Sequence, residues 1–138
     1  MSAGDNEKNF RMRMTGNIKS KISFKHKDSK SNVYISVDGH FEYNGRLYLV
    51  EVDSGNEAKL LAGQYILLNS IYKQDVIEGR MYAPKDCVFL VIHFYNDYNV
   101  ERTKNVLSFL KNKLNLEISF LAIHQENIKD WDCLISQL

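Results

Sequence analysis

Three acidic side chains are the residues of this sequence whose types and spacing fit catalytic or metal chemistry. Asp38 precedes the dipeptide Asn44-Gly45, and Glu51 and Asp53 follow it on the other side. If Asn44 and Gly45 form a two-residue hairpin turn, counting back along the pairing places Asp38 directly opposite Glu51. Side chains alternate between the two faces of a strand, so Asp53 would share the face of Glu51. The hairpin therefore predicts one surface with three carboxylates.

Two carboxylates that face each other across a strand pair repel, because their Cβ atoms lie only about 4.5–5.5 Å apart. Either a shared proton, which raises the pKa of one carboxyl group, or a divalent cation with oxygen ligands relieves this repulsion. The third carboxylate favours a cation, Mg²⁺ or Mn²⁺, with Asp38, Glu51 and Asp53 as its ligands. Acidic residues that only keep an exposed hairpin soluble are the alternative.

A helix is expected to begin directly after the second hairpin strand. Ser54 and Glu57 have the spacing of a capping box, in which the two side chains satisfy backbone N–H groups at the helix start. Apolar residues then recur at helical spacing as far as Tyr72. The first turns of this helix carry Lys59 and Gln64, and we expect both within reach of the carboxylates.

Lysines alternate with apolar residues before the hairpin. The apolar residues Ile18, Ile22 and Phe24 fall on one side of an expected half-buried strand. The opposite side carries Lys19, Lys21, Lys25 and Lys27. Such a stripe suits salt-dependent contact with nucleic-acid phosphates, and these four lysines are the candidate DNA-binding residues. An edge strand whose lysines prevent aggregation is the other interpretation.

The remaining pattern predicts an α/β (α+β) fold with a mixed central sheet of about five strands flanked by helices. Residues 1–15 show no periodicity and are expected to form a flexible leader, and residues 16–138 to form a single domain. The expected segments are a first strand at 33–43, a second at 46–53, a loop at 75–86, a strand buried on both faces at 87–94, a helix at 100–114, a parallel strand at 116–123 and a closing helix at 127–138.

Composition and charge limit the class of protein. The chain has 138 residues and is 44% hydrophobic, and it contains no apolar run of the length a membrane span needs. Two cysteines without CxxC spacing predict reduced thiols, no zinc site and a cytoplasmic location. Residues 1–30 hold eight Lys or Arg and three acids, so they carry +5 and the remainder −4. A basic segment ahead of an acidic body suits a protein that brings carboxylates to a polyanion.

These motifs resemble the PD-(D/E)xK, or restriction-endonuclease-like, superfamily. Val37-Asp38, Glu51-Val52-Asp53 and Gln64-Tyr65 stand where that superfamily has an Asp, an acidic-x-Lys on the next strand, and a helix with Gln or Tyr. Within it, residues 33–125 look most like the plasmid replication-relaxation proteins. The resemblance implies a restriction-endonuclease-like core that contains the hairpin at 33–53 and a Mg²⁺- or Mn²⁺-dependent DNA nuclease of plasmid or phage and other mobile-element replication, in a bacterial or phage-infected cytoplasm.

The resemblance also gives each candidate residue a role. Asp38 and Glu51 would bind the metal, Asp53 would bind metal or act as a base, and Gln64 would position water or DNA. Asp53 stands where the superfamily carries its catalytic Lys, so Lys59 is the candidate to stabilise the phosphate. The alternative is an inactive accessory protein that keeps the fold and binds DNA or a replication partner. DNA is the expected ligand, together with a homodimer mate or a replication or mobilisation protein.

Overall fold

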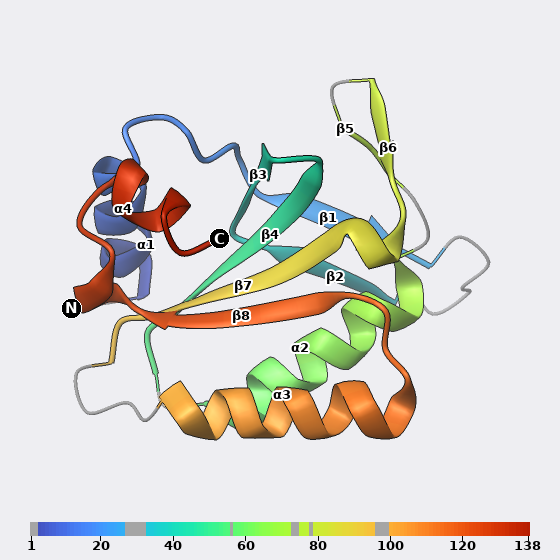
Figure 1. Ribbon diagram of the computed structural model, residues 1–138. Coiled ribbons are helices and arrows are strands. Elements are labelled where there is room, and N and C mark those ends of the chain that lie inside the picture. Colours follow the sequence, from blue (N-terminus) through green and yellow to red (C-terminus); the bar gives the residue numbers. More distant parts are fainter. Residues whose placement is uncertain (1–2, 27–32, 56, 73–74, 78, 96–99) are drawn as a thin grey trace.

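A mixed four-stranded sheet forms the centre of the protein (Figure 1). The computed structural model describes residues 3–26, 33–55, 57–72, 75–77, 79–95 and 100–138. The sheet has the order β3-β4-β7-β8, with β3 antiparallel to β4 and the other neighbours parallel. Its strands are β3 (Gly39–Tyr43), β4 (Arg46–Asp53), β7 (Cys87–His93) and β8 (Ser119–His124). The expected parallel pairing of these last two strands is confirmed, but β8 is mostly half-buried because it lies at the edge of the sheet.

The hairpin turn forms as the sequence predicts. Tyr43 pairs with Arg46, and the two turn residues both take positive φ, 54° at Asn44 and 78° at Gly45. Because turn and register are linked, Gly39 pairs with Val50, and the ladder counts back to place Asp38 level with Glu51.

The expected central sheet of five strands is not confirmed: the described strands form a central sheet of four, because the chain bends at Asp38. The predicted strand at 33–43 is divided there into β2 (Tyr34–Val37) and β3. β2 pairs with β1 (Ile22–Lys25) in a separate two-stranded sheet, so neither strand joins the central sheet. The expected loop at 75–86 instead contains a small hairpin, β5 (Asp75–Ile77) and β6 (Arg80–Tyr82), followed by a 3-10 turn, η1 (Pro84–Asp86).

Helices cover both faces of the central sheet (Figure 1). On one face lie α2 (Ala58–Ile71) and α3 (Val100–Leu114), which meet the sheet in a core that includes Leu49, Tyr65 and Phe89. On the other lie α1 (Ala3–Arg13) and, after the 3-10 turn η2 (Gln125–Asn127), α4 (Trp131–Ile135). Every residue of β7 is buried, as expected for a strand with helices above and below.

The N-terminal segment is a helix packed on the sheet, where the sequence had suggested a flexible leader. Asn6, Phe10 and Met14 are all buried, and their spacing of four residues places them on one side of α1 and its C-terminal extension. Phe10 packs edge-to-face against Phe94, with 6.5 Å between ring centroids. This packing fixes α1 against the face of the sheet that α4 also covers.

Candidate functional site

The bend at Asp38 places its carboxylate within hydrogen-bonding distance of the neighbouring strand, β4. Asp38 Oδ2 accepts a hydrogen bond of 2.9 Å from the backbone N–H of Val52. Since Val52 directly follows Glu51 in β4, the bond holds the Asp38 carboxylate beside the Glu51 side chain, and the two carboxyl groups are hydrogen-bonded to each other. The structure thus brings together the two acids that the hairpin register predicted to face each other.

The Asp38–Glu51 pair is electrostatically strained. Burial, and then the negative charge of Asp38, raise the pKa of Glu51 to about 8. Burial also raises the pKa of Asp38, and the hydrogen bond from Val52 opposes that rise. Among the described residues, Glu51 Oε2 is buried and has no hydrogen-bond partner. At neutral pH the pair therefore holds one proton between its two carboxyl groups.

Helix α1 adds the charges of one more acid and of a cation to this pair, and neither residue was predicted from the sequence. The negative charge of Glu7 raises the pKa of Asp38, and the positive charge of Arg11 lowers it. Arg11 Nε lies 3.4 Å from Glu7 Oε1, and its Nη2 donates to the backbone carbonyl of Asp38. The spacing of four residues between the apolar Phe10 and Met14 was the available signal, since it fits one face of a helix.

Close packing at Gly39 fixes the position of the bend. A Cβ atom at Gly39 would lie 2.7 Å from Ile18 Cγ2 and 2.9 Å from the carbonyl oxygen of Lys19. The Arg11 side chain also donates to the carbonyl of Lys19, at 3.2 Å. The segment around Ile18 and Lys19, the bend at Asp38 and the end of α1 are thus held as one unit beside the acid pair.

Asp53 lies in a different set of contacts from Asp38 and Glu51. Its Oδ2 atom is 3.0 Å from Nδ1 of His93, and its Oδ1 accepts a hydrogen bond of 3.2 Å from the N–H of Gly55. β4 and β7 are parallel and in register, so Asp53 and His93 end their strands side by side. The structure therefore forms a pair of acids and a separate Asp53–His93 pair, not one cluster of three acids.

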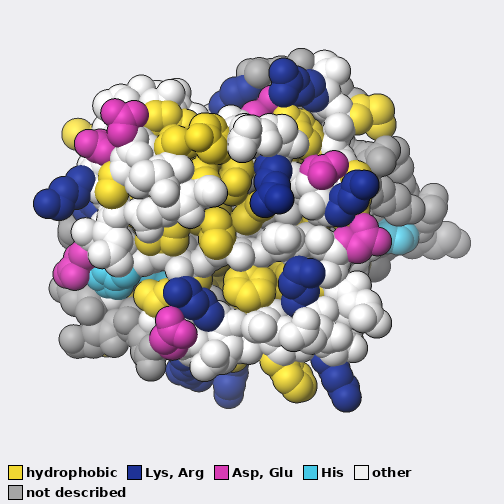
Figure 2. Space-filling model, in the orientation of Figure 1, with side chains coloured by type: hydrophobic (Ala, Val, Ile, Leu, Met, Phe, Trp, Pro, Cys, Tyr) yellow, Lys and Arg dark blue, Asp and Glu magenta, His cyan; other side chains and the backbone are white. Residues whose placement is uncertain are grey.

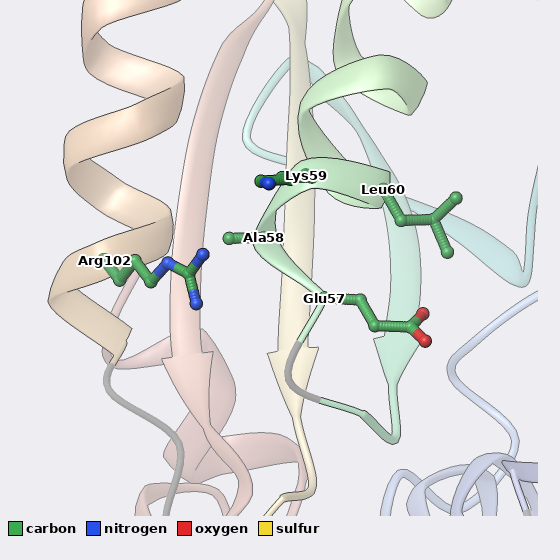
Figure 3. Close-up of a pocket in the computed structure, with 5 residues that line it drawn as sticks. All are labelled: Glu57, Ala58, Lys59, Leu60 and Arg102. Carbon is green, nitrogen blue, oxygen red and sulfur yellow. The ribbon is translucent and has the colours of Figure 1, made fainter.

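Helix α2 starts later than expected, and its two candidate residues, Lys59 and Gln64, lie in different surroundings. Its N-cap is Glu57, which makes no side-chain capping hydrogen bond, so the predicted capping box of Ser54 and Glu57 does not form. Gln64 hydrogen-bonds to Glu51 and opposes the rise of its pKa. Lys59 instead lies in the first turn, where it lines a cavity together with Arg102 of α3 (Figure 3). The structure brings Gln64 to the acids and directs Lys59 elsewhere.

The lysines before the hairpin do not form a uniform stripe. Lys21 and Lys25 are exposed, whereas Lys19 is half-buried and its backbone bridges to His40. Lys27 lies outside the described residues. On the face drawn in Figure 2, Lys and Arg side chains are spread among acidic and hydrophobic ones instead of gathering in one cluster. Contact of these lysines with DNA remains a prediction.

The donor set of the acid pair suits a hard cation. No group of three or more His, Cys, Asp or Glu within the described part of the chain is arranged to hold a metal ion. Mg²⁺, however, is usually held by only one or two protein carboxylates, with water and substrate phosphate as its other ligands. The buried and unpartnered Oε2 of Glu51, next to the Asp38 carboxylate, fits such a site.

Comparison with known proteins identified no relative of this chain. Searches against protein-family models, curated proteins and solved structures found no match to the chain. Among the described helices, none is long and apolar enough to cross a membrane. Both cysteines, Cys87 and Cys133, are free thiols.

Proposed function

We propose that this protein is a Mg²⁺- or Mn²⁺-dependent nuclease that hydrolyses phosphodiester bonds of DNA. The observation that carries this proposal is the Asp38–Glu51 pair, in which burial and like charge raise the pKa of Glu51 to about 8. A divalent cation between the two carboxylates would replace their shared proton and relieve their repulsion. The proposal includes a role in plasmid, phage or mobile-element replication, which rests on the resemblance of the sequence motifs alone.

Asp38 and Glu51 would be the metal ligands. When bound, the metal supplies a water of lowered pKa and neutralises charge on the phosphate. Val52 orients the Asp38 carboxylate through its N–H, and Gln64 orients the Glu51 carboxylate from α2. Glu51 must lose its proton before it binds a cation, so metal binding should strengthen as the pH rises toward 8.

The arrangement of elements supports this function. Asp38 stands at the start of a hairpin strand, Glu51 near the end of the next, and Gln64 on the helix that follows. This is the order of the PD-(D/E)xK motif, on a sheet in which β4 continues through α2 into a parallel strand, β7. Arg11 supplies a positive charge beside Asp38, on the opposite side of the sheet from α2.

A second candidate function is DNA or partner binding without catalysis. The observation that favours it is at Asp53, which stands in the position of the superfamily Lys and is hydrogen-bonded to His93. Lys59 is not among the groups that act on the acid pair, and it lines a cavity with Arg102 of α3 instead. Such an accessory protein would bind DNA in the presence of EDTA and leave it intact.

A plasmid-nicking assay distinguishes the two functions. Supercoiled plasmid would be incubated with the native chain and Mg²⁺ or Mn²⁺, and with Asp38→Asn, Glu51→Gln and Glu117→Gln in parallel. Glu117 is an exposed acid outside the site and serves as the matched control. We expect nicking by the native chain and by the control, and a loss of at least about 100-fold in the other two variants, as for removal of a group that stabilises charge in the transition state. No nicking with either metal, or nicking that both site variants retain, would refute the nuclease proposal.

A further inference from the structure

A cavity of about 440 Å³ lies between the start of α2 and the start of α3. Its lining consists of Glu57, Ala58, Lys59 and Leu60 from α2 and of Arg102 from α3. Figure 3 shows Lys59 and Arg102 on the same side of α2, with the guanidinium of Arg102 directed toward Ala58 and Lys59. Two cationic side chains from two helices therefore face one hollow.

Neither of these cations is neutralised within the described structure. Lys59 and Arg102 are exposed, and neither makes a hydrogen bond or ion pair with another described residue. The carboxylate of Glu57 projects to the opposite side of α2 (Figure 3). Glu101, the neighbour of Arg102 in the chain, is paired with Lys104 at 3.3 Å. The hollow thus has positive charge that no carboxylate of the described chain offsets, and an anion would be attracted to it.

The cavity and the acid pair lie on two sides of the same helix. Gln64 extends from α2 to Glu51, whereas Lys59, little more than one turn earlier, lines the cavity with Arg102 of α3. A DNA strand that ran from the acid pair past the first turn of α2 would bring a neighbouring phosphate to Lys59 and Arg102.

We propose that Lys59 and Arg102 together bind a backbone phosphate of DNA outside the scissile bond. This inference rests on the proposed function, which supplies DNA as the ligand. Arg offers a planar fork of donors to phosphate oxygens and Lys a mobile point charge, so the two are complementary on one phosphate. The other lining side chains, Ala58 and Leu60, offer no base-reading groups, so the contact positions DNA without regard to sequence.

The test measures DNA affinity apart from cleavage. A fluorescent duplex is titrated in EDTA with the native chain, Lys59→Gln, Arg102→Gln, the double variant and Lys113→Gln, at several salt concentrations. Lys113 is an exposed lysine near the other end of α3 and is the control. We expect about a fivefold to tenfold weaker binding in each single pocket variant and no change in the control. Because the two side chains share one phosphate, the double variant should lower the slope of log K against log salt by about 0.9.

Several outcomes would overturn this inference. Native affinity in the double variant, or an equal loss in Lys113→Gln, would show that the cavity does not bind DNA. Competition by inorganic phosphate or a mononucleotide separates the sources of phosphate. Micromolar binding of either one that depends on Lys59 and Arg102, without DNA binding, would assign the cavity to a small phosphate compound and refute the proposal.

The two proposals can fail separately. Pocket-dependent DNA binding without any nicking would leave this inference in place and refute the nuclease. Nicking by the native chain, with DNA affinity unchanged in the Lys59 and Arg102 variants, would support the nuclease proposal and refute this inference. Thermal unfolding of each variant, followed by circular dichroism, confirms that an exposed substitution has not unfolded the protein.

Discussion

Replacement of Glu51 by Gln should remove the pH dependence of stability that the raised pKa of Glu51 causes. The pKa of Glu51 is about 8 in the folded protein against an ordinary value of 4.5. Between these two values the folded chain holds a proton that the unfolded chain releases. The stability of the native protein therefore falls as the pH rises through this window. Gln carries no proton to lose, so the variant should lack this part of the decline.

The size of the effect follows from the pKa of Glu51. A rise from 4.5 to about 8 sets an upper limit of about 5 kcal/mol, at about 1.4 kcal/mol for each tenfold change in proton affinity. Asp38 shares the repulsion and water entry screens it, so we expect about 2 kcal/mol. For a chain of this length that difference corresponds to roughly 7 °C in Tm. Three other charged groups face this site. Asp38 acts on Glu51, and Glu7 and Arg11 act on Asp38.

The assay is urea unfolding of the native chain, Glu51→Gln and the control Glu117→Gln at about pH 5 and about pH 9, the two sides of the window. From the lower to the higher pH, the free energy of unfolding should fall by about 2 kcal/mol more in the native chain and in the control than in Glu51→Gln. At the higher pH, Mn²⁺ at about 100 times its Kd should raise the free energy of unfolding of the native chain by about 2.7 kcal/mol. It should not do so for Glu51→Gln.

An equal pH dependence in Glu51→Gln and the native chain would refute the reasoning, since it would show that Glu51 titrates normally. A variant that is less stable than the native chain at the higher pH would do so too. If Mn²⁺ did not stabilise the native chain, the acid pair would share a proton but would not bind a cation.

Two further substitutions test the structure around the acids. Gly39→Ala should lower the free energy of unfolding by about 1–3 kcal/mol, because the new Cβ would overlap Ile18 and the carbonyl of Lys19; urea unfolding measures this, and a neutral substitution would show that the bend is not tightly packed. Asp53→Ala should cost about 1–3 kcal/mol through loss of its hydrogen bonds with His93 and Gly55. Calorimetric titration should show that Asp53→Ala still binds Mn²⁺, and loss of binding in a folded variant would restore Asp53 to the metal site.

Local chemistry made the acid pair predictable from the sequence. Asn44 and Gly45 both accept positive φ, and that fixes a two-residue turn and the register of its strands. Once the register is fixed, the opposition of Asp38 and Glu51 follows from counting along the ladder. The buried strand and amphipathic helix between residues 87 and 114 were predictable for the same reason, because periodicity is a property of neighbouring residues.

Tertiary packing decided what else lies beside those acids. Asp53 meets His93 because β4 and β7 pair in parallel register, although α2, β5, β6 and η1 separate them in the chain. Nothing in the sequence near either residue indicates this contact. Lys59 and Arg102 line one cavity because α2 packs against α3. Glu7 reaches the neighbourhood of Asp38 because Phe10 anchors α1 on the sheet. Such contacts depend on which distant surfaces bury each other, and turn chemistry and alternation within one segment do not specify that choice.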